Sequence, residues 1–219
     1  MGISQRRTCR PMGGIILKKI LAIGGAVIKT AKAELKEAII NDKVEMLIHN
    51  GGSVFHDFQL ATEDLESHSH TVDVLVEDYS INRPASILVW RWIHYDSAPS
   101  NSITALCQSK NIPVLMFTGL ACDFWQIVGA HTAWQSLASR AYNDFSNLTQ
   151  RFHKPFHYVC MGSAVIHPEV FLKAIAGIKL PEFTADVVDF LDMYRPRTRV
   201  AKYGTYYKMT HKEYFKEVL

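Results

Sequence analysis

The sequence lacks most of the features that mark a specialised class of protein. No apolar run reaches the roughly 18 residues of a membrane-spanning helix. The net charge is only +3, from 24 basic and 21 acidic residues that are evenly spread, which favours neither nucleic acid nor a membrane surface as a partner. The GxSxG, HExxH, GxGxxG and P-loop motifs are absent, so these common enzyme and nucleotide signatures give no lead.

Cysteine is scarce as well, and the cysteines show no CxxC spacing. All except Cys9 have apolar neighbours, which predicts reduced, buried thiols in a cytoplasmic protein. His68 and His70 lie near acidic residues but lack the partner spacing of a metal site, so no bound metal is expected. The three cysteines with apolar neighbours are Cys107, Cys122 and Cys160.

The amino-terminal residues contain three arginines ahead of a short apolar run. Lys18 and Lys19 interrupt that run, and no cleavage site of small residues follows, which argues against a signal peptide. We expect residues 1–11 to form a poorly ordered tail, with Met12 as an alternative start. Residues 12–219 are long enough to bury a substantial core and are expected to form one domain.

Hydrophobic patterning predicts strands and helices that alternate along the chain. The expected strands are 18–24, 44–49, 113–118, 156–161 and 198–202, and the expected helices are 26–41, 54–65, 102–110, 124–152, 168–178 and 183–192. Residues 87–93 suit either a strand or a buried helix, and residues 202–216 a surface strand and helix. The alternation is typical of an α/β fold in which helices cover both faces of a parallel sheet.

Four apolar stretches run into a glycine and then into a helix-like segment. The junctions are Ile23-Gly24-Gly25, Asn50-Gly51-Gly52-Ser53, Thr118-Gly119-Leu120 and Met161-Gly162-Ser163. In open α/β sheets, free backbone N–H groups at such junctions bind nucleotides and anions at the carboxyl ends of the strands. The regular order of the junctions therefore predicts a ligand site at one edge of the sheet.

The second junction adds titratable side chains to its glycines. A Gly-Gly turn lets a ligand approach the backbone closely, and the N–H groups of Ser53 and Val54 are expected to point out of the helix start. His56 and Asp57 follow in the first turn or so. Asp57 near a helix N-terminus is expected to stay charged and to hold an amine or a ribose hydroxyl. The alternative is that Asp57 only complements the helix dipole and that His56 only packs.

The third and fourth junctions suggest further contacts. Asp123 lies beside two aromatic residues, Phe124 and Trp125, which suits either a cradle for an organic cation or a buried cap among core aromatics. Gly162 and Ser163 suit a phosphate or ring contact ahead of the next helix.

Taken together, these segments resemble the deoxyhypusine synthase family, in particular its bacterial deoxyhypusine synthase-like branch. The resemblance covers most of residues 20–210 and keeps the family's order of motifs. The matching segments are Gly24-Gly25-Ala26-Val27-Ile28-Lys29, Asn50-Gly51-Gly52-Ser53-Val54-Phe55-His56-Asp57-Phe58, Gly162-Ser163-Ala164-Val165-Ile166 with Pro168-Glu169-Val170-Phe171-Leu172-Lys173-Ala174, and Tyr194-Arg195-Pro196-Arg197.

The resemblance implies a Rossmann-like α/β fold, a homotetramer or dimer, NAD as cofactor and transfer of the aminobutyl group of spermidine. It also implies a cytoplasmic protein without nucleic-acid or membrane partners. Asp57 would be the acidic residue after the dinucleotide turn, and Asp123 would receive the amine end of a polyamine. The implied cofactor-binding residues are Gly24, Gly25, Asn50, Gly51, Gly52, Gly162, Ser163, Thr184 and Asp189.

The chain departs from the family's pattern in residues that carry its chemistry, and Pro168 stands where the family has a histidine. The chain also has no Trp-Gly-Lys segment, which in deoxyhypusine synthases carries the catalytic lysine. The first hypothesis is therefore NAD-dependent chemistry on a small amine or polyamine, with His56 moving a proton and Asp57 and Asp123 holding the cation. The second is a catalytically silent oligomer that binds a nucleotide or small ligand. The third is a hydrolase or lyase that uses the same ligand site at the edge of the sheet for another substrate.

Overall fold

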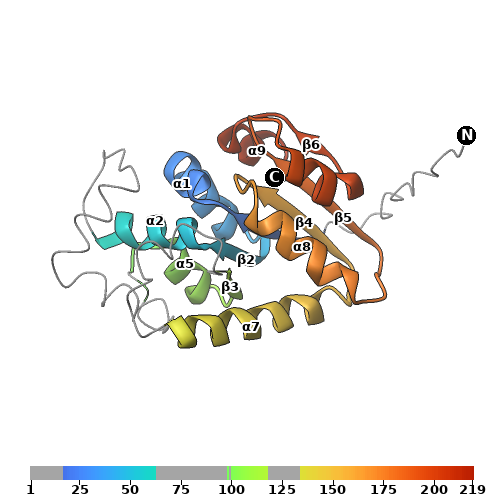
Figure 1. The fold of residues 1–219 in the computed structure, drawn as a ribbon. Coiled ribbons are helices and arrows are strands. Elements are labelled where there is room, and N and C mark those ends of the chain that lie inside the picture. Colours follow the sequence, from blue (N-terminus) through green and yellow to red (C-terminus); the bar gives the residue numbers. More distant parts are fainter. Residues whose placement is uncertain (1–16, 63–97, 99, 118–133) are drawn as a thin grey trace, which may run out of the picture.

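The computed structural model describes residues 17–62, 98, 100–117 and 134–219, and all statements below concern these residues (Figure 1). Six strands form one sheet in the order β3-β2-β1-β4-β5-β6, and every neighbouring pair is parallel. The strands are β1 (Lys19–Ile23), β2 (Val44–Asn50), β3 (Val114–Phe117), β4 (Phe156–Met161), β5 (Phe183–Val188) and β6 (Tyr206–Tyr207).

The strand order reverses between β1 and β4. From β1 the chain runs outward to β2 and β3, returns to β4 beside β1, and runs outward again on the other side. This is the order of two mononucleotide-binding halves placed side by side, and ligands in such sheets bind where the order reverses. The sheet has this order although the sequence has no GxGxxG motif.

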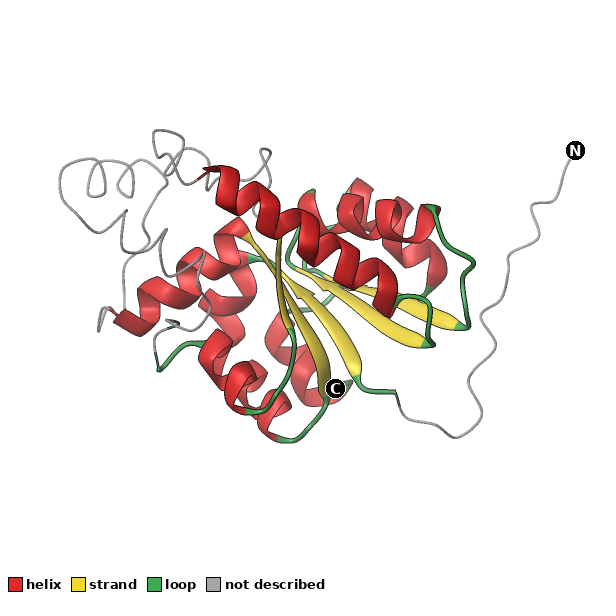
Figure 2. Cartoon of the chain, turned by 90° about the horizontal axis from the view of Figure 1, so that it is seen from below, coloured by secondary structure: helices red, strands yellow, loops and turns green. Residues whose placement is uncertain are grey.

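Helices cover both faces of the sheet, as Figure 2 shows. They are α1 (Gly25–Ile40), α2 (Gly51–Thr62), α5 (Ile103–Ser109), α7 (Trp134–Arg151), α8 (Ile166–Ala176) and α9 (His211–Glu217), with a turn of π-helix at η2 (Pro196–Val200) and of 3-10 helix at η3 (Ala201–Tyr203). The predicted α/β fold with a parallel sheet between helix layers is confirmed.

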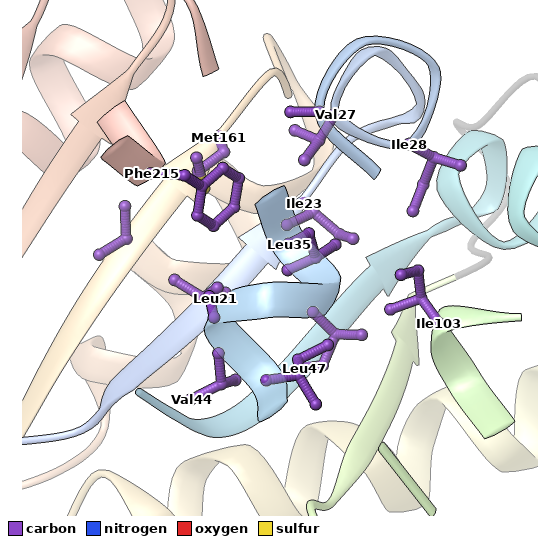
Figure 3. Packing of buried hydrophobic residues seen from close by; sticks show 14 of the residues in the cluster. Leu21, Ile23, Val27, Ile28, Leu35, Val44, Leu47, Ile103, Met161 and Phe215 are labelled. Atoms are coloured by element: carbon purple, nitrogen blue, oxygen red, sulfur yellow. The ribbon is translucent and has the colours of Figure 1, made fainter. Parts of the chain in front are cut away.

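Two buried clusters lie on opposite faces of the sheet. On one face, α1 packs Val27, Ile28 and Leu35 against Leu21 of β1, and α5 and α9 extend the layer (Figure 3). On the other face, α7 and α8 pack with η2 on aromatic residues of the strands. Because the central strands are buried on both sides, they show continuous apolar runs without alternation.

Stacked rings dominate the second cluster. The ring centroids of Phe152 and Phe156 are 4.2 Å apart, those of Tyr158 and Phe171 4.6 Å, and those of Phe156 and Phe183 4.9 Å. These contacts join the residue that follows α7 to β4, α8 and β5, and they contribute beyond the burial of apolar area alone. They fix the second half of the sheet, which carries one wall of the site.

The predicted elements at the start of the chain and around β4 are confirmed, whereas two late ones were wrong. Residues 183–188 form strand β5 and not part of a helix, because they pair along their whole length with β4. Residues 198–202 lie in η2 and η3 and not in a strand, and Val200 packs under α8 in the second cluster. Pro196 begins η2, where its missing N–H costs nothing.

Several predictions fall outside the described residues. They concern the tail 1–11, the segment 87–93, the first part of the helix 124–152 and the junction around Gly119 with Asp123. No helix in the described part of the chain is both long and apolar enough to cross a membrane.

Candidate functional site

A pocket of about 440 Å³ opens at the carboxyl ends of β1, β2 and β4, where the strand order reverses. Three of the four glycine junctions meet there. The lining residues are Gly25, Ala26 and Lys29 after β1, Asn50, Gly52 and His56 after β2, and residues 162–166 after β4. The edge of the sheet that the sequence predicted as a ligand site is thus hollow.

The two glycines after β1 have different environments. Gly25 lines the pocket, and a Cβ atom there would lie 2.8 Å from Cδ2 of His56, so α1 and α2 begin in close contact. Gly24 does not line the pocket. Its N–H donates to the carbonyl of Met161, and a Cβ on it would lie 1.9 Å from the carbonyl oxygen of Gly162. Gly24 therefore joins β1 to β4, and its role as a ligand contact stays a prediction.

Helix α2 begins earlier than predicted, directly at Gly51, with no intervening turn. The carboxamide of Asn50 caps it, since Oδ1 accepts the N–H of Ser53 at 2.9 Å. The N–H of Ser53 is thus occupied and not free for a ligand, contrary to the prediction. Gly51 is buried, whereas Gly52 lines the pocket and has space for a Cβ, with Oδ1 of Asn50 the nearest atom at 3.7 Å.

Asp57 lies in the protein interior. Its carboxylate is fully buried and accepts the N–H of Ile103 at 2.7 Å, the N–H of Thr104 at 2.9 Å and the Thr104 hydroxyl at 2.9 Å. Lys32 of α1 lies 3.7 Å from Oδ1. Both carboxylate oxygens are therefore used to hold the start of α5. Asp57 is not part of the described pocket lining, and its role as an amine or ribose ligand stays a prediction.

Burial sets the protonation behaviour around Asp57. Desolvation raises the pKa of the Asp57 carboxyl, and the three hydrogen bonds and Lys32 oppose that rise. Desolvation also lowers the pKa of the Lys32 ammonium, which Asp57 opposes. Nearby, burial lowers the pKa of His49 to about 3 and that of His167 to about 4, so both imidazoles are neutral at pH 7.

The third wall follows β4. Gly162 has a φ of +61°, and a Cβ there would lie 3.0 Å from Cε1 and Nε2 of His211. The residue therefore needs glycine for its backbone conformation and for the close ring. Oγ of Ser163 accepts the N–H of His167 at 3.2 Å, and His167 Nε2 lies 2.8 Å from the carbonyl oxygen of Ile23. These contacts fix the loop 162–166 against β1.

Two further predicted contacts lie away from the pocket. Thr184 belongs to the amino-terminal half of β5, opposite His157, whereas the pocket is at the carboxyl ends of the strands. Its role as a nucleotide contact, which the family resemblance implies, stays a prediction. Asp189 does follow the carboxyl end of β5, but its Oδ1 accepts the N–H of Leu191 at 3.1 Å and it does not line the pocket.

The polar lining of the described pocket consists of hydrogen-bond donors and neutral groups. Lys29 is the only lysine or arginine in this lining, and no carboxylate is part of it. His56 lines the pocket, and its role as a proton carrier stays a prediction, whereas Asp123 lies outside the described residues. The sequence reasoning missed Lys29, although its position one helical turn after Gly25 was a usable signal.

The described residues contain no group of three or more His, Cys, Asp or Glu side chains able to hold a metal ion. Two predicted buried thiols, Cys107 and Cys160, are buried and free. Burial raises the pKa of Cys107 to about 12 and that of Cys160 further still. These thiols are packing groups and not reactive ones.

Neither a protein-family model nor a curated protein sequence matches the chain. Solved structures do share its fold. The cyanobacterial arginine dihydrolase ArgZ aligns with 90% of the chain at a TM-score of 0.55 and 14% identity. A conserved protein of Methanococcus maripaludis S2, proposed to be of the LOR/SDH type, aligns with 91% at 0.58 and 10% identity. A proposed deoxyhypusine synthase of Entamoeba histolytica aligns with 91% at 0.52 and 8% identity.

These similarities establish the fold as Rossmann-like and related to that of a deoxyhypusine synthase, and at such identities they establish no more. The chain spans 28% of the arginine dihydrolase, 60% of the Methanococcus protein and 73% of the Entamoeba protein. The function therefore has to be argued from the pocket itself.

Proposed function

We propose that this protein binds a phosphate-bearing nucleotide, with NAD as the first candidate, in the pocket at the carboxyl ends of β1, β2 and β4. The observation that carries the proposal is the composition of that pocket. Its described lining joins the starts of α1 and α2 to one lysine and contains no carboxylate. Helix starts and a cation attract a phosphate group, and a volume of about 440 Å³ is in the range of small-molecule sites.

Two further facts support a nucleotide. The pocket lies at the point where the strand order reverses, which is where α/β sheets of this order bind nucleotides. The deoxyhypusine synthase resemblance of the sequence implies NAD, and one structural neighbour is a proposed deoxyhypusine synthase. Lys29 would supply the charge for a phosphate group, and His56 would lie beside the bound ligand.

Amine chemistry is the finer part of the sequence hypothesis and has less support. The arginine dihydrolase neighbour acts on an amino acid that carries a guanidinium group. In this chain, however, Asp57 is buried against α5, and the described pocket lining contains no carboxylate for a cation. The geometry thus favours the nucleotide-binding reading over an aminoalkyl transferase.

Isothermal titration calorimetry of the full chain tests the proposal with NAD⁺, NADH, ADP-ribose and spermidine. We expect the three nucleotides to bind and spermidine not to bind. Lys29→Met should weaken NAD⁺ binding about 10-fold, because a charge-assisted contact to phosphate is lost. Lys36→Met removes the same charge two turns along α1, away from the pocket lining, and should change affinity less than about 2-fold.

The outcomes separate the readings. Absence of binding by all three nucleotides at about 1 mM overturns the nucleotide proposal. Thermal unfolding gives a second readout, because a ligand that binds the folded state has to raise the apparent stability by mass action. Tight spermidine binding without nucleotide binding favours the amine reading instead. Equal losses in the Lys29 and Lys36 variants would mean that net charge, and not the pocket, attracts the ligand.

A further inference from the structure

The Asn50 side chain is held in one orientation at the mouth of the pocket. Its Oδ1 accepts the N–H of Ser53 at 2.9 Å, and that N–H can be satisfied only by an acceptor, which fixes the carboxamide against a flip. Within the described part of the chain, the Asn50 Nδ2 group donates to no protein acceptor. It is also not one of the fully buried polar atoms that lack a partner. Since Asn50 lines the pocket, its NH₂ group is available to a ligand.

A buried chain of hydrogen bonds supports Asn50 from below. The Asn50 N–H donates to Oγ of Ser53 at 3.0 Å, and this Oγ lies 2.9 Å from Nδ1 of His49. Nε2 of His49 lies 3.4 Å from Oγ1 of Thr104, whose hydroxyl donates to Asp57 at 2.9 Å. His49, Ser53, Thr104 and Asp57 are all fully buried.

Such a chain restricts Asn50 more than a single cap would. Each member is buried with its partners nearby, so moving one side chain leaves another polar group unsatisfied. The chain begins at the start of α5 and ends at the pocket, and it joins residues about 50 positions apart in the sequence. Asp57 is thus linked to Asn50 through Thr104, His49 and Ser53.

We infer that Asn50 is a specificity-determining residue, whose NH₂ group donates to a phosphate oxygen of the ligand, and that His49 is the positioning residue that holds it there. The inference deepens the nucleotide proposal and rests on it. Asn50 and Lys29 together give the described lining two side-chain donors for one acceptor-rich group. An amine, which has no acceptor at neutral pH, gains nothing from either.

Two cap-retaining variants isolate the NH₂ group. Serine and aspartate are as good as asparagine at a helix N-cap, so Asn50→Ser and Asn50→Asp keep the bond to the Ser53 N–H and the melting temperature. Both lose the Nδ2 donor: aspartate has no hydrogen to donate, and the serine hydroxyl, which would accept the Ser53 N–H, would lie one bond closer to the backbone than Nδ2. Binding of ADP should fall about 10-fold in Asn50→Ser and about 100-fold in Asn50→Asp, where a carboxylate also repels phosphate. Binding of adenosine should stay within about 2-fold in both variants.

His49→Gln tests the positioning role. A loose Asn50 should lower the ratio of ADP to adenosine affinity about 5-fold, a readout that a purely structural change would leave unaltered. Unchanged ADP affinity in Asn50→Ser, with the wild type binding ADP, overturns the role of Asn50 and leaves the nucleotide proposal standing. If ADP affinity falls in Asn50→Asp but not in Asn50→Ser, repulsion by the new charge and not the lost contact is responsible. That result also overturns the role of Asn50. Wild type that binds neither ADP nor NAD⁺ overturns both proposals.

Discussion

Asp57 binds Thr104 twice, through its backbone N–H and through its side-chain hydroxyl, each at 2.9 Å. The two residues lie on α2 and α5, and a third bond from Ile103 completes the contact. This arrangement ties the connection between β2 and β3 to the start of α2, beside the pocket. Its strength and its consequences for stability can be measured.

Asp57→Asn should lower the free energy of unfolding by about 1–3 kcal/mol, because one of the two amide positions would then present NH₂ to a backbone N–H. Urea unfolding followed by circular dichroism gives the value. Asp42→Asn is the matched control, since Asp42 is exposed and asparagine tolerates its positive φ. A loss below about 0.5 kcal/mol in Asp57→Asn would show that the α5 contact contributes little.

Gly24 and Gly52 should respond to alanine in opposite ways. Gly24→Ala places a methyl group 1.9 Å from the Gly162 carbonyl oxygen and should cost about 1–3 kcal/mol of unfolding free energy. Gly52→Ala meets only Oδ1 of Asn50 at 3.7 Å and should stabilise by up to about 1 kcal/mol, since alanine is favoured in helices. Thermal unfolding measures both, and a destabilised Gly52→Ala would mean that its site is not open.

The same Gly52→Ala variant should nevertheless bind NAD⁺ more weakly, because its methyl group stands in the pocket lining. We expect about a 10-fold loss by calorimetry, in a protein at least as stable as the wild type. Unchanged affinity would place the ligand away from the start of α2.

Acid should destabilise the fold through its buried histidines. Burial lowers the pKa of His49 to about 3 and of His167 to about 4, from 6.5 in the unfolded chain. Between these values the unfolded state binds more protons, so stability is complete above pH 6.5 and falls as the pH decreases toward 4. Each histidine contributes a slope of up to about 1.4 kcal/mol per pH unit.

Urea unfolding at several values from about pH 6 to 4.5 measures this slope. His49→Gln and His167→Gln should each reduce the slope by up to about 1.4 kcal/mol per pH unit, whatever their effect on stability at pH 7. Equal slopes in the wild type and both variants would contradict burial of neutral imidazoles.

Cys107 and Cys160 should resist alkylation in the folded protein. Burial raises the pKa of Cys107 to about 12 from 9.0, so its thiolate is roughly a thousandfold rarer than that of a free thiol. Iodoacetamide labelling resolved by peptide mass spectrometry should modify both residues only after unfolding. Rapid labelling of either in native buffer would mean that its face of the sheet opens.

Much of the fold could be predicted from local patterns. The runs at 18–24, 44–49 and 156–161 are apolar and bounded by polar or glycine residues, and each is a strand in the structure. Ser102 marks the start of α5 as a cap, and Asn111 with a φ of +55° follows its end. Such signals act between residues close in sequence, which is why they can be recognised without knowing which segments pair in the fold.

The late elements could not be assigned in this way. Phe183–Val188 is short and apolar with buried Asp186, a pattern that suits a helix as well as a strand. Pairing with β4 decided it, and Asp186 is accommodated by His157 at 2.6 Å and by the N–H of Thr205 at 2.7 Å. These partners are distant in sequence, so no local pattern indicates them.

The amino-acid sequence by itself determined the parallel α/β architecture and the edge of the sheet at which glycine junctions gather, because apolar runs and glycine turns act over a few neighbouring residues. Only the tertiary structure decided what the side chains at that edge do. It turned Asp57 inward to α5 and left Asn50 and Lys29 at the pocket. The physical reason is that a buried carboxylate takes whatever donors the fold brings to it, and here they come from a helix 46 residues further along the chain.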